Sequence, residues 1–253
     1  MSLATIGVVL ENKQIVPGIF DMSIRWEGAD QCLPGQFVNI LCEGGGALLR
    51  RPISVCDAGR DLLRIVYEVK GTGTALLSHY EAGRKIDFLA PLGHGFTVKE
   101  AKNPILIGGG IGTYPLLLLA KQLKEPQIFL GFRSETRITL AKDFSAAGAL
   151  HIATDDGSAG HHGLVTDLVR RFLSEKGSEM MYACGPKPML KAVKSLAEEF
   201  QVSCELSMEE RMGCGIGACL VCACKTADKD GNWKHSHVCT DGPVFDAAEV
   251  IFE

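Results

Sequence analysis

Four cysteines near the C-terminal end constrain this chain more than any other feature. Cys214, Cys219 and Cys222 fall in a loop of glycine and alanine with the spacing C-x4-C-x2-C, and Cys239 follows further along. Such a loop can curl around a small inorganic cluster and direct backbone N–H groups toward it. This order of cysteines is the plant-type spacing for a [2Fe–2S] cluster. The sequence therefore predicts a protein that moves electrons one at a time, with these four cysteines as the metal ligands.

Two other uses of the cysteines compete with a cluster. Structural zinc sites usually pair C-x2-C units, and the x4 gap and the lone distal cysteine fit that pattern poorly. Disulfides are the second alternative, but 10 cysteines in 253 residues is a modest density, and a chain of this length does not need covalent staples. Cys224 is a further sulfur nearby. The x2 spacing favours Cys222 as the ligand, which leaves Cys224 as a buried neighbour.

Composition narrows the class of protein. Apolar residues make up 46% of the chain and charged residues 22%, as in a globular protein with a substantial core. The net charge of −4 and the lack of a Lys/Arg run argue against nucleic acid as a partner. The N-terminus shows no secretory leader, and the longest apolar stretch, 105–120, is interrupted by glycines and a proline. We therefore expect no membrane span and a cytoplasmic location, where cysteines stay reduced.

The pattern of the chain changes near residue 100. Before it, short alternating strands such as 36–42 and 62–69 are separated by turns, which predicts an antiparallel β-barrel. After it, apolar strands alternate with helical patterns at 114–124 and 187–200, which predicts βαβ units and a parallel sheet. From 202 onward the chain is rich in Gly and Cys, and we expect a cluster, more than an apolar core, to organise it.

A glycine-rich turn, Gly108–Gly112, joins an apolar strand to a helical pattern. Glycines permit a close backbone approach, and a helix N-terminus favours the negative charge of a pyrophosphate. Tight turns also need glycine for steric reasons alone, so the flanking strand and helix carry most of the prediction. The spacing is not G-x-G-x-x-G, and the ordinary two-halved dinucleotide fold is not inferred.

Two segments of the first hundred residues suit a flavin pyrophosphate. Arg50 to Ser54 reads Arg-Arg-Pro-Ile-Ser; an arginine gives bidentate phosphate contacts, and a serine hydroxyl can reach a ring heteroatom. A solvated arginine pair on a strand is the alternative. Gly71–Thr74 is a Gly/Thr turn that precedes a helical stretch, and it can hold a phosphate at the positive end of a helix dipole.

The order of these pieces resembles the ferredoxin–NAD(P) reductase superfamily. The shared motifs are Arg51–Ser54, Gly71–Thr74, Leu92–Phe96, Gly108–Gly112 and Cys184–Pro186. With the C-terminal cysteines and the ending Asp-Gly-Pro-Val-Phe-Asp at 241–246, nearly the whole chain resembles the electron-transfer subunits of class 1B dihydroorotate dehydrogenases. The middle motifs occur in many flavoreductases, whereas the combination with the cluster loop is far more specific.

The resemblance implies a fold and a set of residue roles. It implies an FAD-binding β-barrel over 1–99, an NAD-binding α/β domain over 100–201 and a small [2Fe–2S] domain over 202–253. The implied flavin residues are Arg51, Pro52, Ile53, Ser54, Val66, Tyr67, Glu68, Gly73 and Thr74. The implied nicotinamide-nucleotide residues are Gly109, Gly110, Ile111, Gly112, Thr113, Cys184, Gly185 and Pro186. One departure is Ile53, where many superfamily members place an aromatic residue against the flavin.

The resemblance also implies a partner. In the family, a catalytic subunit that holds FMN oxidises dihydroorotate to orotate, and electrons then pass to the cluster, to FAD and to NAD⁺, in a heterotetramer with two copies of each subunit. No catalytic residue is assigned to this chain, which alone should oxidise NADH with artificial acceptors. Glu135 would repel a 2′-phosphate, which favours NAD over NADP.

Two alternative functions remain open at this stage. The first is the small flavin and iron–sulfur subunit of another oxidoreductase, of the ferredoxin:NADP oxidoreductase or sulfide dehydrogenase type. The second is a redox sensor, which would need a basic helix for a DNA or protein partner, and the sequence shows none. A catalytic subunit that copurifies with the chain would separate the enzyme-class alternatives.

Overall fold

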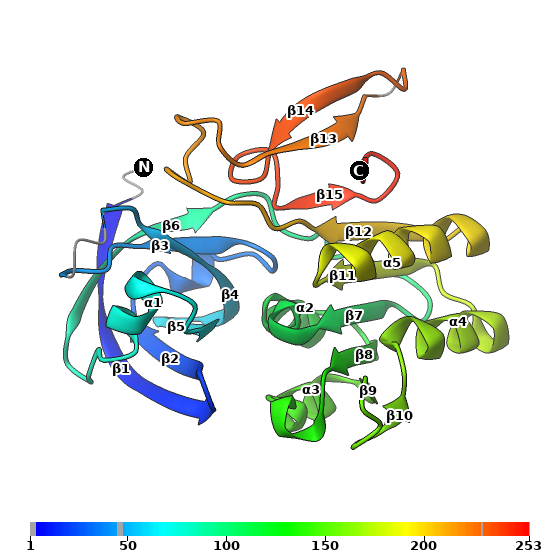
Figure 1. Ribbon diagram of the computed structural model, residues 1–253, viewed down its shortest axis with the longest axis horizontal. Helices are drawn as coiled ribbons and strands as arrows, with labels where there is room; N and C mark the ends of the chain where they lie inside the picture. Colours follow the sequence, from blue (N-terminus) through cyan, green and yellow to red (C-terminus); the bar gives the residue numbers. More distant parts are fainter. Residues whose placement is uncertain (1–3, 45–47, 229, 253) are drawn as a thin grey trace.

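The computed structural model describes residues 4–44, 48–228 and 230–252. The first three residues, on which the expectation of no leader partly depends, lie outside the described part. A closed barrel with strand order β1-β2-β5-β4-β3-β6 forms the N-terminal part, at the left of Figure 1. Its strands are β1 (Ala4–Val16), β2 (Ile19–Arg25), β3 (Phe37–Ile40), β4 (Arg51–Gly59), β5 (Leu62–Glu68) and β6 (Lys85–Leu92).

Alternation along the strands builds the interior of the barrel. In β6 every second residue is buried, and Ile86 and Phe88 are almost fully covered, as expected when one face of a strand lines a core. The short helices η1 (Ala29–Gln31) and α1 (Thr72–Leu77) lie in the connections between strands. The predicted antiparallel barrel is confirmed.

A seven-stranded sheet with order β10-β9-β8-β7-β11-β12-β15 forms the central part. Its pairs are parallel except β12–β15, which is antiparallel. Its strands are β7 (Ile105–Gly109), β8 (Gln127–Phe132), β9 (Ala149–Thr154), β10 (His161–His162), β11 (Met180–Cys184), β12 (Ser203–Ser207) and β15 (Val244–Asp246). β7 is buried throughout, because helices cover both faces of a parallel sheet.

The helices beside this sheet are α2 (Leu117–Gln122), α3 (Ala141–Ala147), α4 (Val165–Lys176) and α5 (Lys187–Phe200), with a short η3 (Glu135–Arg137). Figure 1 shows α4 and α5 together beside the sheet. The buried residues of α5 are Leu190, Val193, Leu196 and Ala197, a spacing that places one apolar stripe against the strands. The predicted parallel α/β arrangement is confirmed. In the described residues, no helix is long and apolar enough to cross a membrane.

The helix expected over 114–124 begins differently. Residues Gly110–Leu116 form a 3₁₀-helix, η2, and only Leu117–Gln122 is α-helical. Gly110 has a φ of 55° and Pro115 lies inside η2. Glycine lowers helix propensity and proline removes an N–H donor, so the regular α-helix starts only after both.

The C-terminal part combines a hairpin with additions to the central sheet. The hairpin pairs β13 (Ala223–Ala227) with β14 (Trp233–His237), at the top of Figure 1. β12 and β15 both lie in the central sheet, so that sheet continues past residue 201, and the domain boundaries themselves stay a prediction. Val238 and Val250 are fully buried. An apolar core therefore contributes to the organisation of this part, for which the sequence had predicted a larger role of the cluster.

Candidate functional site

The predicted flavin motif forms the start of strand β4. In the antiparallel pairing with β3, Arg51 lies opposite Ile40, Pro52 opposite Asn39, and Ser54 opposite Phe37. The four motif residues Arg51, Pro52, Ile53 and Ser54 are all half-buried. Their side chains therefore lie at the edge of the barrel, where a cofactor can contact them while the strand ladder holds their backbone.

Arg51 and the predicted pyrophosphate turn lie against each other, although they are separate in sequence. A Cβ built on Gly73 would overlap the Arg51 side chain, with Cζ 2.7 Å away. Thr74 Oγ1 accepts hydrogen bonds from the backbone N–H groups of Lys70 and Gly71, at 2.9 and 3.2 Å. Among the described residues, the Arg51 guanidinium donates to the backbone carbonyls of Leu49 and Arg50. Because no carboxylate neutralises it in these contacts, its charge suits a phosphate.

The three predicted residues of β5 differ in surroundings. Tyr67 points into the barrel core, where its hydroxyl donates to Asn12 Oδ1 at 3.0 Å, and burial raises the pKa of this phenol far above its ordinary value. Val66 packs in the core that the barrel shares with the central sheet. Glu68 accepts a hydrogen bond from Arg137 of the central part at 2.9 Å. Glu68 is thus placed at the junction between the barrel and the nucleotide-binding part.

The two predicted nicotinamide-nucleotide motifs are brought into contact. β7 and β11 are parallel neighbours, and Gly108 pairs with Cys184. A Cβ on Gly112 would lie 2.6 Å from the Cys184 carbonyl oxygen and from Gly185 Cα, so the glycine is needed for this approach. Burial raises the pKa of the Cys184 thiol to about 12, which keeps it a neutral thiol. Thr113 is fully buried and donates to the Gly110 carbonyl at 3.0 Å.

These motifs lie at the topological switch point of the sheet. The chain passes from β7 to β8 on one side, and β11 lies on the other side of β7. Ligands of open α/β sheets bind outside the carboxyl ends of the strands at such a point. Gly109–Thr113 begin at the last residue of β7 there, and Cys184–Pro186 begin at the last residue of β11. Near the end of β8, Glu135 is exposed, while Arg137 is committed to Glu68 and to the Pro17 carbonyl.

The cysteine loop surrounds one sulfur with N–H donors. Cys214 Sγ accepts hydrogen bonds from the backbone N–H groups of Ile216, Ala218 and Cys219, at 3.4, 3.2 and 3.4 Å. The loop curls because Gly215 and Gly217 have φ of 73° and 81°, a region that glycine enters without strain. Although burial raises it, these backbone donors and the Cys219 thiol lower the pKa of Cys214 to about 7. The loop thus stabilises negative charge on sulfur.

The four predicted ligands lie as two pairs. Cys214 and Cys219 form one pair, since the Cys214 N–H donates to Cys219 Sγ at 3.4 Å. Cys222 and Cys239 form the other, with sulfurs 3.2 Å apart. Burial, with Cys222 beside it, raises the pKa of Cys239 to about 11. Cys219 is exposed, while Cys222 and Cys239 are buried.

This donor set fits a two-iron cluster. Each iron of a [2Fe–2S] cluster takes two cysteine thiolates. The structure supplies two pairs, three of whose members lie in the loop and the fourth, Cys239, after the β13–β14 hairpin. Among the described residues, no three or more His, Cys, Asp or Glu side chains converge as a site for a single metal ion. Cys224 is buried, as the spacing predicted, and its thiol pKa is raised to about 11 by burial.

The sequence reasoning missed the residues that join the barrel to the cluster segment. Asn39 Nδ2 donates to the Cys214 carbonyl at 2.9 Å, and the backbone N–H of His94 donates to the Gly242 carbonyl at 2.6 Å. The only local signal was an asparagine in the otherwise apolar strand Phe-Val-Asn-Ile, 37–40. These contacts place the cluster loop beside the strand pair that carries the flavin motif.

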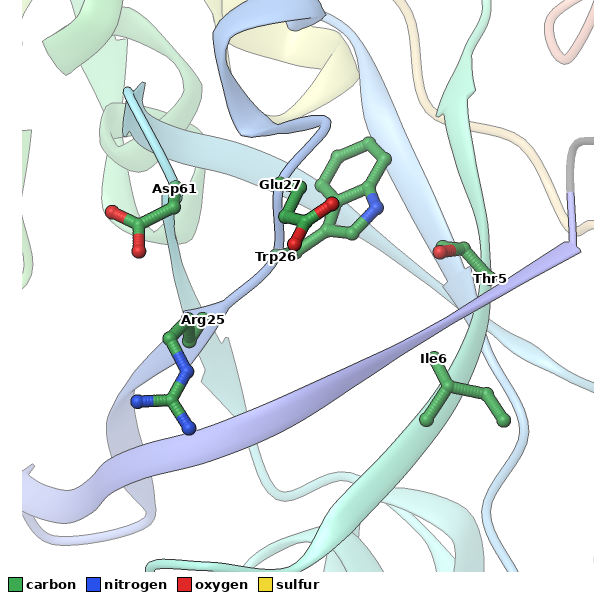
Figure 2. A pocket seen from close by; sticks show the side chains of 6 residues that line it. All are labelled: Thr5, Ile6, Arg25, Trp26, Glu27 and Asp61. Carbon is green, nitrogen blue, oxygen red and sulfur yellow. The ribbon is translucent and has the colours of Figure 1, made fainter.

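A cavity of about 310 Å³ lies elsewhere on the barrel. Figure 2 shows Thr5 and Ile6 on one side of it, facing the segment Arg25–Glu27 and Asp61. None of the predicted site residues lines it, so it belongs to none of the three candidate sites.

Comparison with known proteins defines the class first. The sequence matches the family described as "Oxidoreductase NAD-binding domain" over residues 106–195. Among solved structures, a chain of an NADH-dependent reduced ferredoxin–NADP oxidoreductase superposes with a TM-score of 0.86 at 31% identity, covering 98% of this chain and 90% of that one. A ferredoxin NADP⁺ reductase from Neisseria gonorrhoeae with bound FAD and NADP shares the fold, with a TM-score of 0.67 at 15% identity over 82% and 100%. The chain is thus a ferredoxin reductase-like oxidoreductase subunit.

The cluster segment then identifies the family. Residues 209–251 match the "Iron-sulfur cluster binding domain of dihydroorotate dehydrogenase B". The electron transfer subunit of dihydroorotate dehydrogenase B (NAD(+)) from Caldanaerobacter subterraneus subsp. tengcongensis is 42% identical, covering 96% of this chain and 97% of that protein. The corresponding subunit from Enterococcus faecalis OG1RF is 41% identical, covering 96% of both. The chain belongs to the family of dihydroorotate dehydrogenase B electron transfer subunits, which confirms the predicted FAD, iron–sulfur cluster and NAD.

Proposed function

We propose that this chain passes electrons from a partner subunit that holds FMN, through a [2Fe–2S] cluster and FAD, to NAD⁺. The partner oxidises dihydroorotate to orotate, and this step belongs to pyrimidine biosynthesis. The observation that carries the proposal is the contact between Asn39 and the Cys214 carbonyl, because Asn39 lies opposite Pro52 of the flavin motif. A single-electron site and a flavin site are thereby neighbours in one chain.

The order of the cofactors follows from their chemistry. A nicotinamide exchanges two electrons as hydride, a cluster exchanges one, and a flavin can exchange either. A flavin site between the other two is therefore the arrangement that lets them communicate. In the structure, the barrel that carries the flavin motif contacts the nucleotide-binding part through Glu68 and Arg137 and the cluster segment through Asn39.

The residues of this chain divide into three groups in the proposal. Arg51 and Gly73 with Thr74 hold the flavin pyrophosphate, and Pro52, Ile53, Ser54 and the β5 residues Val66, Tyr67 and Glu68 border the rest of the flavin. Gly109–Thr113 and Cys184–Pro186 receive the nicotinamide nucleotide at the switch point of the sheet. Cys214, Cys219, Cys222 and Cys239 ligate the cluster. None of these residues acts as an acid or base.

The partner docks, in this proposal, where the cluster loop meets solvent. Cys219 is exposed, and Ile216, Leu220 and Val221 beside it are 47%, 59% and 58% exposed. Exposed apolar side chains that are grouped in one loop, as here, are a common feature of protein interaction sites. We propose a heterotetramer with two copies of each subunit. A cytoplasmic location is supported by the six cysteines outside the proposed cluster, which form no disulfide, since such thiols persist in a reducing compartment.

A different partner is the main alternative, because the superposition on the ferredoxin–NADP oxidoreductase chain covers nearly the whole protein. The purified chain should be yellow-brown, contain iron, acid-labile sulfide and FAD, and oxidise NADH with ferricyanide. Mixed with an FMN-containing catalytic subunit from the same source, it should support dihydroorotate-dependent reduction of NAD⁺. Zinc without flavin in anaerobically purified protein would rule out electron transfer. A chain with both cofactors that copurifies with a subunit inert toward dihydroorotate would favour the alternative.

A further inference from the structure

Asn39 is an unusual residue for its place in the barrel. It lies in the middle of β3, where all four residues are buried, and its own exposed fraction is 1%. Asparagine is depleted in strands because its amide gains little from packing and competes for backbone hydrogen bonds. Pro52, the residue opposite on β4, has no N–H to donate. The backbone carbonyl of Asn39 instead accepts a hydrogen bond from the Arg50 guanidinium at 3.4 Å. Strand formation alone does not explain an asparagine here.

One end of the Asn39 amide bonds the cluster loop. Its nitrogen donates to the Cys214 carbonyl at 2.9 Å, across 175 residues of sequence. The assignment of nitrogen and oxygen follows from chemistry, because a carbonyl only accepts. The next residue must be glycine for this approach, since a Cβ on Gly215 would lie 2.5 Å from Asn39 Nδ2. The asparagine and the glycine are matched across the barrel–cluster contact.

The other end of the amide has no partner. Among the described residues, Asn39 Oδ1 is the one buried side-chain nitrogen or oxygen without a hydrogen bond. A buried unsatisfied acceptor is destabilising, whereas an apolar residue of the same shape would remove that cost. A leucine at this buried position, on the face of β3 that packs toward the cluster segment, would therefore serve packing at least as well. The advantage of asparagine must lie in its contact with the Cys214 loop.

The bonded carbonyl controls the direction of the loop. The Cys214 carbonyl oxygen is directed toward β3, where it accepts the Asn39 hydrogen bond. The chain then turns at Gly215, and the N–H groups of Ile216, Ala218 and Cys219 reach Cys214 Sγ. Successive N–H groups of this kind stabilise an anion and tune the potential of a cluster. Releasing the carbonyl would let the peptide rotate and weaken this set of donors.

We propose that Asn39 is a positioning residue, which anchors the first cluster ligand to the flavin-bearing strands and thereby sets both the N–H environment of the cluster and its place relative to the flavin. This inference rests on the proposed function, in that a cluster and a flavin exchange electrons within this chain. In this proposal Asn39 acts through its hydrogen bond to the Cys214 carbonyl.

The test compares Asn39→Leu and Asn39→Asp with the wild-type chain, each purified anaerobically with its cofactors. Leucine removes the donor and the unpaired acceptor together, and an aspartate carboxylate keeps the shape but cannot donate. We expect normal FAD content and normal NADH–ferricyanide activity in both variants. Iron release to a chelator should be roughly tenfold faster, and reduction of the cluster by NADH roughly tenfold slower, the effect of losing about one hydrogen bond to a buried group. The electron paramagnetic resonance spectrum of the reduced cluster should shift.

Ser178→Ala is the matched control. Ser178 Oγ also donates to a distant backbone carbonyl, Asn103 at 2.8 Å, but it lies at the amino end of β11, opposite the cofactor motifs. Iron release, spectrum and cluster reduction should stay at wild-type values. Gly215→Ala blocks the same contact from the loop side and also strains a residue with a φ of 73°, so it should speed iron release at least as much as Asn39→Leu.

The outcomes separate this inference from the proposed function. Wild-type protein without flavin or labile sulfide would remove the proposed function itself. A wild-type chain that reduces its cluster with NADH, beside Asn39 variants with the same spectrum, iron release and rate, would overturn the inference alone. A parallel loss of FAD and cluster in both variants would also overturn it, because that result means a damaged barrel. If Asn39→Leu fails to fold, Asn39→Asp decides the question.

Discussion

Replacement of Gly73 by alanine is expected to separate flavin affinity from folding stability. Gly73 is buried in α1, and its φ does not require glycine. A methyl group there would overlap the Arg51 side chain, with Cζ 2.7 Å and Cγ 3.0 Å away. The backbone can accept the alanine, so the arginine must move. The substitution therefore acts on the residue proposed to bind the flavin pyrophosphate without touching that residue's own chemistry.

Gly73→Ala should change folding stability and FAD affinity in opposite directions. In a compatible helical position, alanine in place of glycine stabilises a protein by about 0.4–1 kcal/mol. A hydrogen bond between charged groups contributes about 1.5–3 kcal/mol, so displacing Arg51 should weaken FAD binding by roughly 10- to 150-fold. Titration of the apoprotein with FAD, followed by flavin fluorescence, measures the affinity. Urea unfolding of the same apoprotein measures the stability, which should be unchanged or higher.

A double-mutant cycle tests the physical cause. If Gly73→Ala acts by displacing Arg51, it should have little further effect in an Arg51→Ala background, because coupled residues are not additive. Gly59→Ala is the control. Gly59 lies in β4, at the opposite end of the strand from Arg51, and nothing lies within 4 Å of the new Cβ. Equal losses of FAD affinity in the wild-type and Arg51→Ala backgrounds would refute the reasoning, as would wild-type affinity in Gly73→Ala itself.

Three further predictions concern the cluster, the barrel and the nucleotide. Cys219→Ser should abolish electron passage to the partner subunit while NADH–ferricyanide activity persists, and an equal loss of both would contradict separate roles. Arg64→Ala should lower the free energy of unfolding of the apoprotein by about 3 kcal/mol, measured in urea, because it leaves buried Asp21 and half-buried Asp143 without their cation. Adding Asp21→Asn to the Arg64→Ala variant should recover part of that loss. Glu135→Gln should raise kcat/KM for NADPH roughly five- to tenfold, by removing a repelling charge, with a much smaller change for NADH; equal changes for both nucleotides would refute this.

Local sequence pattern was sufficient to predict helices and strands whose periodicity lies within one segment. The alternation of 62–69 predicted β5, observed at Leu62–Glu68, and the helical pattern at 187–200 predicted α5 within the same bounds. Both depend on a period that residues close in sequence specify. The cysteine spacing likewise predicted a shared site, because three of the four ligands fall in one short loop.

Contacts between distant segments were beyond local pattern. Asn39 and Cys214 are 175 residues apart, and nothing in the strand sequence indicates which loop its amide meets. β15 adds to the edge of the central sheet antiparallel to β12, a pairing set by the whole fold rather than by its three residues. The assigned site residues of the flavin and nucleotide motifs stay predictions, and the structure adds which of them are neighbours.

Shared apolar cores hold the barrel, the central sheet and the cluster segment together. One core joins Phe37 and Leu92 of the barrel with Cys222 and Cys239 and with the central sheet. Another joins Val66 of the barrel with residues of β7, β8 and η2. Close-packed interiors do not deform continuously. Burial therefore determines how the barrel, the central sheet and the cluster segment pack together. Within that packing, the proposed anchor at Asn39 positions the Cys214 loop, and the Glu68–Arg137 contact joins the barrel to the central sheet.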